Sequence, residues 1–417
     1  MKKEDALKMD DNDQLSHLKK EFLYGDDNDE KKIYFCGNSL GLQHKSLKNK
    51  INEHLEQWKK FAVENHFNGD YPWMDIQDKI KEKLKLFLGC SENEIAIMNS
   101  LSVNLHLMMV SFYSPSKTKN KILIEENAFS SDRYVVNSQL KHHGFNESSL
   151  LTVYPEEDHS IDEDKIISKI ITNKESLSLV LLPGVQYYNG QVLNIHKISK
   201  VCKDNDITIG LDLAHMVGNV KIDLKSYDVD FATWCSYKYL NSGPGGVSGI
   251  YVNSRHINND IVRFEGWWGN KLSSRFEMLK KYDPEHSAEA WVLSNPPVVL
   301  LDIHLASLEV FCNAGLDKIF HKSKLLSDFL YDGLNSIDNY SHFFDIITPV
   351  GSARRGSQIS LFFKKSSEIF FNEISKKFVV DYRKPNVVRV APVPLYNSFY
   401  EVYLFVKEID RLVKSSS

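Results

Sequence analysis

The sequence predicts an α/β protein with a large domain built on a mostly parallel sheet and a smaller α+β domain. A chain of 417 residues is too long for one small core. Between about residues 81 and 252, short apolar runs alternate with longer amphipathic stretches, as in βαβ units. After residue 306 a long amphipathic helix, two strand-like runs and a closing helix follow. We therefore divide the chain into an N-terminal arm and helix (1–60) packing with the small domain, a large domain (61–305) and a small domain (306–417).

The strands of the large domain are short and rich in branched or aromatic residues, which is typical of a sheet covered on both faces. In chain order we expect strands at 121–124, 179–182, 207–211, 230–235 and 249–252, and in the small domain at 358–364 and 387–392. A closing helix should extend through Lys414. The strand-like run 33–36 and a helix at 48–61 precede the large sheet, so we expect the small domain to cover them.

Composition and charge exclude several classes of function. The chain has 51 basic and 55 acidic residues without a basic stripe, which argues against a nucleic-acid partner and favours a small-molecule ligand. Its five cysteines are scattered without a C-x-x-C pair, so we expect reduced thiols and no metal site. Neither a targeting sequence nor an apolar run of the roughly 20 residues that a membrane helix needs is present. We expect a soluble cytoplasmic protein.

Asp212, His215 and Lys238 form the constellation that carries chemistry. Asp212 ends one predicted strand and Lys238 follows the next, 238 − 212 = 26 positions later, which fits one crossover in a parallel sheet. Both side chains should face the same crevice at the carboxyl edge. Pyridoxal phosphate needs this pair, because a lysine amine holds its aldehyde and a carboxylate keeps its pyridine nitrogen protonated. A lysine in this position is by itself usually a solvated surface residue, and the Asp-x-x-His partner is what changes that interpretation.

Two further segments are candidate phosphate-binding sites. Residues 243–246 (GPGG) lack the spacing of a nucleotide-binding loop and fit a turn that lets backbone pass close to the cofactor. Residues 99–104 (NSLSVN) open an amphipathic helix whose free N–H groups attract an anion, although the same residues would also serve as a plain helix cap. We expect the phosphate at the second segment.

Six segments resemble the signatures of the kynureninase family, in family order and across nearly the whole chain. They are 35–43 (FCGNSLGLQ), 98–106 (MNSLSVNLH), 212–219 (DLAHMVGN), 234–241 (WCSYKYLN), 294–297 (SNPP) and 389–398 (RVAPVPLYNS). The resemblance implies the type I fold of pyridoxal-phosphate enzymes, with a seven-stranded, mostly parallel sheet flanked by helices. It also implies a homodimer that hydrolyses kynurenine or 3-hydroxykynurenine to alanine and anthranilate or 3-hydroxyanthranilate, in tryptophan catabolism and NAD biosynthesis.

The same resemblance implies roles around the cofactor. Lys238 would hold the aldehyde, Asp212 would pair with the pyridine nitrogen, and His215 would lie beside the ring oxygen. The remaining cofactor contacts would be Leu101 and Ser102 at the phosphate, Phe129 stacked on the ring with Asp132 nearby, and Tyr237, Tyr188, Trp267 and Asn295, some of them reaching across a dimer interface. As a bare aromatic residue, Phe129 would more often belong to a core.

Substrate contacts are implied at four positions. Arg389 would clamp the α-carboxylate, since a guanidinium presents two donors in the plane that a carboxylate accepts, whereas the plain alternative is a surface salt bridge. His66 and Asn295 resemble contacts to the aryl end, and Ser39 is a further candidate. Two positions depart from the family: Pro183 replaces a common serine and is therefore left out of the site, and Gln186 replaces a common histidine.

The chemistry that follows is removal of the α-proton by the freed lysine amine, addition of water to the γ-carbonyl and cleavage of the Cβ–Cγ bond. Tyr188 is the candidate proton donor. Three alternatives stay open. A cysteine desulfurase or an aminotransferase would share Asp212 and Lys238, and a serine hydrolase would use Ser39 in the G-x-S-x-G match at 37–41. A binding protein without catalysis would keep the fold alone.

Overall fold

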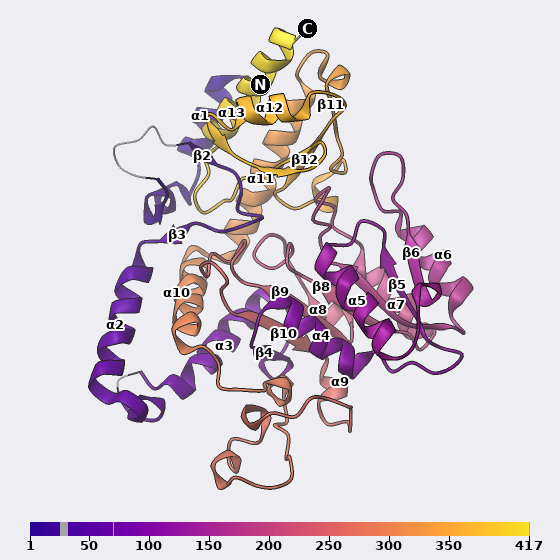
Figure 1. Cartoon of the computed structure of the whole chain (residues 1–417). Coiled ribbons are helices and arrows are strands. Elements are labelled where there is room, and N and C mark those ends of the chain that lie inside the picture. The colour runs from indigo at the N-terminus through magenta and orange to yellow at the C-terminus, as the bar shows by residue number, and fades with distance from the viewer. Residues whose placement is uncertain (26–31, 70, 417) are drawn as a thin grey trace.

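The large domain is built on a seven-stranded sheet in the computed structural model, which describes residues 1–25, 32–69 and 71–416 (Figure 1). The strand order is β4-β10-β9-β8-β7-β5-β6. In chain order these strands are β4 (Ile95–Ile97), β5 (Lys121–Glu125), β6 (Leu150–Val153), β7 (Leu177–Pro183), β8 (Thr208–Asp212), β9 (Phe231–Cys235) and β10 (Ser248–Val252). Only β10 runs antiparallel to its neighbours, so the predicted mostly parallel seven-stranded sheet is confirmed.

Helices cover both faces of this sheet, which explains why its strands are apolar throughout. One hydrophobic cluster joins one face to α3 (Ile76–Leu88), α6 (Glu163–Asn173), α7 (Ile195–Asp204) and α10 (Val298–Ala314). The other face packs against α4 (Leu101–Phe112) and α5 (Ser130–His142). Two short helices, α8 (Leu224–Tyr227) and α9 (Ser254–Ile257), lie in the connections around β9 and β10.

The small domain has its own four-stranded antiparallel sheet and its own core. The strand order is β11-β12-β15-β14, with bounds β11 (Phe344–Ile346), β12 (Ile359–Phe363), β14 (Asp381–Arg383) and β15 (Val387–Val390). Its helices are α11 (Leu316–Asn335), α12 (Ser367–Ile374) and α13 (Phe399–Ser416). The helix α11 begins directly after α10, and the two meet at an 82° bend around Gly315. The boundary we placed between residues 305 and 306 falls inside α10, and the three-part division stays a prediction.

The N-terminal arm lies against the last elements of the chain. The helix α1 (Lys3–Asp11) packs on α13, and both backbone N–H groups of Phe399 and Tyr400 donate to the carboxylate of Asp10. The strand β2 (Ile33–Tyr34) pairs in parallel with β13 (Phe378–Val379), and β1 (Phe22–Leu23) pairs with β3 (Gln43–His44). Both termini therefore lie together at the small domain (Figure 1). The following helix, α2 (Ser46–Phe61), packs along α10 instead.

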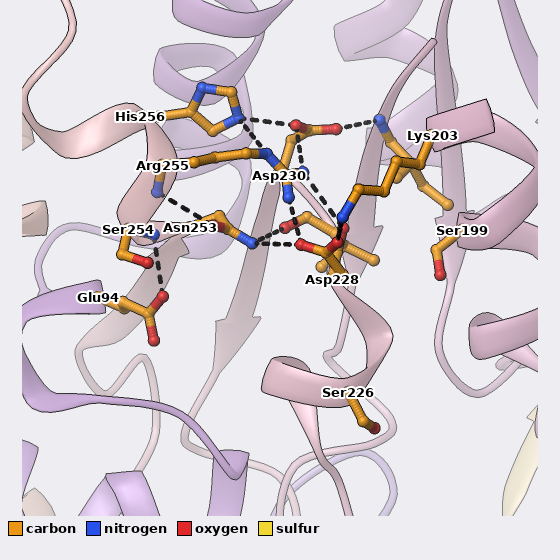
Figure 2. A network of polar contacts seen from close by, with 12 residues as sticks. Glu94, Ser199, Lys203, Ser226, Asp228, Asp230, Asn253, Ser254, Arg255 and His256 are labelled. Atoms are coloured by element: carbon orange, nitrogen blue, oxygen red, sulfur yellow. Dashed lines mark hydrogen bonds and ion pairs between the residues drawn. The ribbon is translucent and has the colours of Figure 1, made fainter. Parts of the chain in front are cut away.

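A polar network joins β8, β9 and β10 at the edge of the sheet where β8 and β9 begin (Figure 2). Asp212 and Lys238 lie at the opposite edge. Asp230, just before β9, accepts from Arg255 Nη2 at 2.6 Å and from the Ile209 backbone N–H at 2.8 Å, and its Oδ1 lies 2.7 Å from His256 Nε2. Asp228 pairs with Arg255 and with Lys203. In this network, hydrogen bonds from fixed protein groups replace the water that would otherwise surround the buried carboxylate of Asp230.

The cysteines and the apolar helices were the two further features considered from composition. All five cysteines are free thiols, with Cys36, Cys202 and Cys235 buried. In the part of the chain that the structure describes, no single helix has the length and apolarity to cross a membrane, and only α10 and α11 taken together, bent as they are, meet those two criteria.

Candidate active site

A cavity opens at the carboxyl edge of the large sheet, where four neighbouring parallel strands end. Glu125, Pro183, Asp212 and Cys235, the last residues of β5, β7, β8 and β9, all line it. The other lining residues are Ser100, Leu101, Ser102, Ala128, Phe129, Ser131, Asp132, Val185, Tyr187, Ala214, His215, Tyr237 and Lys238. Because parallel strands bring their carboxyl ends to one edge, residues that are far apart in sequence meet here.

Lys238 and Asp212 lie in this one cavity, as their spacing predicted. The strands β8 and β9 are direct parallel neighbours, with Asp212 opposite Thr233. Asp212 Oδ1 accepts from the Ala214 backbone N–H at 2.7 Å, which fixes the carboxylate at the strand end. Lys238 Nζ lies 5.9 Å from the centre of the Phe129 ring. A lysine amine, a fixed carboxylate and an aromatic face therefore surround the same space.

Burial sets the charges of the cavity wall. It raises the pKa of Asp132 well above its ordinary value, and the neighbouring Asp212, which Asp132 contacts, adds to the rise. Burial also raises the pKa of Glu125 to about 7, although Gln186 donates a hydrogen bond to this carboxyl group. For His215, burial and then the nearby positive charge of Lys238 lower the pKa well below its ordinary value. Burial thus favours the protonated form of Asp132 and the neutral imidazole of His215.

The N-terminus of α4 lines the cavity with Ser100, Leu101 and Ser102. Ser100 precedes the helix, and its side chain makes no capping hydrogen bond. The N–H groups of the first helical turn therefore stay available, and their dipoles point to the space between Ser100 and Ser102. Leu101 and Ser102, the residues expected at the phosphate, occupy this turn.

Arg389 lies beside the cavity and is held by its own chain. Its guanidinium is fully buried and pairs with Asp381, with Nε 3.0 Å from Oδ1 and Nη2 2.7 Å from Oδ2. Nη1 donates to the backbone oxygen of Tyr187 at 2.7 Å. Ser39 Oγ donates to Asp381 at 2.6 Å and lies 3.4 Å from Arg389 Nη2. The salt bridge that was the plain alternative for Arg389 is thus present, but it is buried.

Besides Arg389 and Ser39, four other candidate site residues lie outside the cavity of their own chain. Tyr188 contacts His159, with ring centres 6.2 Å apart, and does not line the cavity. Trp267 is 44% exposed and donates its indole N–H to the Arg275 backbone oxygen at 2.8 Å. The ring of His66 stands edge-on to Trp73 at 4.9 Å, and Asn295 is exposed. The structure does not bring these four residues to the cavity that Lys238 lines, and their roles stay predictions.

Several lining residues were missed or set aside in the sequence, and three of them bear on the chemistry of the cavity. Pro183, which we left out of the site, lines the cavity because it pairs in register with Asp212. Tyr187, and not its neighbour Tyr188, faces the cavity, with its ring 5.2 Å from that of Phe129. Glu125 could have been found, because a charged residue that ends an apolar parallel strand lies at the edge where ligands bind.

The G-x-S-x-G match serves packing. An added Cβ at Gly41 would lie 2.4 Å from the backbone oxygen of Lys238, and the Gly41 N–H donates to the Tyr237 oxygen at 2.9 Å. The N-terminal arm thus packs closely against the loop that carries Lys238. Among the described residues, the partners found for the Ser39 hydroxyl are Asp381, Arg389 and the Cys36 thiol, and no imidazole activates it. This arrangement does not form a hydrolase triad.

Comparisons with known proteins identify the family. The chain is 42% identical over 408 residues to a kynureninase from Flavobacterium johnsoniae, covering 97% of this chain and 96% of that protein. The chain belongs to the kynureninase family. A kynureninase from Mus musculus is 39% identical and covers 99% of this chain and 93% of its own length. Residues 319–409 also match the family model described as the kynureninase C-terminal domain.

Solved structures confirm the fold class expected for a kynureninase. A cysteine desulfurase from Escherichia coli superposes with a TM-score of 0.77 at 12% identity, covering 96% of this chain and 99% of its own. A cystine C–S lyase gives a TM-score of 0.76 at 14% identity, covering 91% of this chain and 98% of its own. Identities this low establish the shared fold alone.

Proposed function

We propose that this protein is a pyridoxal-phosphate-dependent kynureninase. It hydrolyses the Cβ–Cγ bond of L-kynurenine to anthranilate and L-alanine, and that of 3-hydroxy-L-kynurenine to 3-hydroxyanthranilate and L-alanine. Membership of the kynureninase family supports this assignment. The observation that carries it is the meeting of Lys238, Asp212 and the open N-terminus of α4 in one cavity. We place the reaction in the cytoplasm, in tryptophan catabolism leading to NAD.

The residues of the cavity fit the cofactor. Lys238 would anchor its aldehyde, Asp212 its pyridine nitrogen, the first turn of α4 its phosphate, and Phe129 one face of its ring. Asp132 Oδ1 is buried without a hydrogen-bond partner, which is consistent with a polar group that belongs beside it. When bound, the cofactor supplies an electron sink for the charge that develops at the substrate Cα.

Residues of the chain itself carry out the proton transfers and the hydrogen bonding. With substrate bound, the amine of Lys238 would act as the base that takes the proton from Cα. His215 is held neutral, so it can accept or donate a hydrogen bond without adding charge. Burial raises the pKa of the Tyr187 phenol, which keeps its proton at neutral pH. Because Tyr187 lines the cavity and Tyr188 does not, we assign the proton-donor role to Tyr187.

A homodimer supplies the residues that one chain does not bring to its own cavity. Trp267, Phe276 and Phe67 are 44%, 50% and 57% exposed, and Phe276 contacts both of the others edge-on in one apolar patch. Phe67 follows His66 directly in the sequence. A second copy that covers this patch would remove the aromatic faces from water and would take up Trp267 and Asn295 at its own site.

The rival desulfurase activity needs a reactive thiolate. Cys235 lines the cavity, but burial raises the pKa of its thiol and holds it protonated. Cys312 lies within α10. We therefore expect no sulfide release from cysteine.

The test is the fluorescence of anthranilate released from L-kynurenine by the purified protein supplied with pyridoxal phosphate. We expect activity in the wild type and a loss of at least about a thousandfold in kcat for Lys238→Ala, since the residue both holds the cofactor and moves the proton. The same preparations are assayed for sulfide from cysteine and for keto acids from amino acids. Product in either of those assays, without anthranilate, would overturn the assignment.

A further inference from the structure

A buried glutamine, Gln186, begins the turn that carries Tyr187. Gln186 is only 2% exposed and lies behind the cavity wall, while Tyr187, the next residue, lines the cavity. The backbone of the turn closes on Gln186, because its N–H donates to the Gln191 oxygen at 2.8 Å and its oxygen accepts from the Gly190 N–H at 2.9 Å. Contacts that fix Gln186 therefore also fix the start of the segment that places the Tyr187 ring.

The side-chain amide of Gln186 uses its whole hydrogen-bonding capacity. Its Oε1 accepts from the backbone N–H groups of Tyr188 at 2.5 Å and Asn189 at 3.0 Å, which holds the turn. Its Nε2 donates to Glu125 Oε1 and to the Asn127 backbone oxygen, both at 3.1 Å. An amide has two donor hydrogens and one oxygen with two lone pairs, so these four contacts satisfy it completely. Leaving any of these buried groups unpaired would cost free energy.

These four contacts connect three parts of the cavity wall. Glu125 ends β5 and lines the cavity. Asn127 lies two residues before Phe129, whose ring contacts that of Tyr187 edge-on at 5.2 Å. One amide group thus joins the end of β5, the segment that leads to Phe129 and the turn that carries Tyr187.

The small domain also holds this turn, but through its backbone oxygens. Arg389 Nη1 and Gln358 Nε2 donate to the Tyr187 oxygen at 2.7 and 2.9 Å. These two bonds tie the turn to the small domain. The bonds that tie it to β5 come from Gln186, so the placement of the turn against the large-domain wall of the cavity depends on this side chain.

We propose that Gln186 is a positioning residue of the active-site cavity, which holds the end of β5 and the rings of Phe129 and Tyr187 in one fixed arrangement for the cofactor. This inference deepens the proposed function and rests on it for the nature of the bound ligand. A histidine at position 186 would offer only two ring nitrogens and could not make all four contacts. The glutamine therefore gives the cavity of this chain a support that the imidazole would supply only in part.

The test measures how well the cavity is formed, without turnover. The probe is 4′-deoxypyridoxine 5′-phosphate, which keeps the ring and the phosphate of the cofactor but has no aldehyde for Lys238. Calorimetry gives its affinity for the full-length protein freed of cofactor. We expect Gln186→Met, which keeps the length of the side chain but removes its polar groups, to weaken binding about tenfold. Gln186→His should recover part of this loss, since a ring N–H can still donate to Glu125.

Gln191→Met is the matched control. Gln191 is a fully buried glutamine at the other end of the same turn, but its amide bonds to Asn189 and to the backbone of Ile161, and not to β5. This variant should lower the urea midpoint, as Gln186→Met does, and should keep the affinity for the probe within twofold of the wild type.

A second measurement follows the carboxyl group of Glu125 itself. The hydrogen bond from Gln186 stabilises its charged form, so the loss of this bond should raise the pKa of Glu125 further above the value of about 7. Infrared titration of the buried carboxyl band, identified by its absence in Glu125→Gln, measures this pKa in the cofactor-free protein. The pKa should rise in Gln186→Met and stay unchanged in Gln191→Met.

A folded Gln186→Met variant that binds the probe within twofold of the wild type would overturn the inference. Equal losses of affinity in Gln186→Met and Gln191→Met would also overturn it, because the stability of the turn alone would then decide binding. If Gln186→Met does not fold, Gln186→His is held to the same two criteria. Probe binding that depends on Gln186 in a protein that releases no anthranilate would overturn the proposed function and leave the positioning role standing.

Discussion

Glu125 is the residue whose ionisation is most sensitive to the cavity. It ends β5 with 1% of its surface exposed, and its pKa of about 7 lies above the ordinary value of 4.5 because burial disfavours the carboxylate. An acid with a raised pKa in the folded state binds a proton that the unfolded chain releases. The free energy of unfolding therefore falls as pH rises from about 4.5 to 7 and then stays at the lower level.

We expect Glu125→Gln to remove this pH dependence. The amide keeps an oxygen for the hydrogen bond from Gln186 and carries no charge. The variant should match the wild type below about pH 4.5 and exceed its stability by up to about 3 kcal/mol above pH 7. Urea unfolding of the cofactor-free protein at pH 5 and pH 8 measures the difference. Glu126→Gln, which changes the more exposed neighbour, is the control, and equal pH profiles for wild type and Glu125→Gln would contradict the assignment.

Single site residues could be predicted from the sequence most reliably where a reactive side chain lies at the end of a strand. Asp212 and Lys238 could be paired because parallel strands and their crossover fix the spacing. Tyr187 and Tyr188 could not be distinguished, because the turn after β7 decides which ring faces inward. Trp267 and Asn295 could be named from the family resemblance but not placed, since both lie outside the cavity of their own chain.

Among the elements, β9 depends most on polar contacts at its start. Burial by itself would raise the pKa of Asp230, but hydrogen bonds from His256 and Arg255 outweigh it and hold the pKa below the ordinary value (Figure 2). A lowered acid pKa contributes stability that is fully present above about pH 4 and is lost as pH falls through the folded-state value.

Replacing Asp230 with Asn should therefore destabilise the protein by about 3 kcal/mol at pH 7, because Arg255 and His256 lose a buried carboxylate partner. The difference should shrink toward pH 3. Urea unfolding across this range measures it. Asp206→Asn is the control, since its fully exposed side chain approaches Lys119 at only 4.0 Å. A deficit that persists unchanged at pH 3 would show that packing, and not charge, is responsible.

The N-terminal arm should affect catalysis through the turn at Gly41. A methyl group at this position collides with the backbone of Lys238, so Gly41→Ala should shift the catalytic loop and lower kcat/KM at least about tenfold. Anthranilate release measures the effect. Gly144→Ala, which strains a surface turn with open space around it, should cost stability and leave kcat/KM unchanged. If both variants behave alike, the arm does not position Lys238.

Long and buried strands were found from the sequence more reliably than short or half-buried ones. The five central strands were found because they are continuous apolar runs, and they begin and end within two residues of their expected positions. The edge strands β4 and β6 were missed. The strand β4 is fully buried but only three residues long, and β6 is half-buried over most of its length, so neither stands out as a long apolar run.

The whole molecule is expected to work as a pair of chains. Lys238→Ala and Trp267→Ala should each be nearly inactive. Mixing and refolding them together should recover about one quarter of the wild-type activity, because half of the dimers are mixed and one of their two sites is intact. Anthranilate release from the mixture measures the recovery. If Trp267 serves the cavity of its own chain, no activity returns, and the proposed exchange of residues between subunits is wrong.

The pairing of the first helix and strand with the last ones sets an order of events during synthesis. The partners of β2 and α1 are β13 and α13, which leave the ribosome only after the entire large domain. The large sheet can form on the nascent chain, while α1 and β2 stay without their partners until β13 and α13 have been synthesised. Interrupted translation products should therefore contain a folded sheet and an undocked leading segment, which makes that segment the natural place for a chaperone or a protease to act.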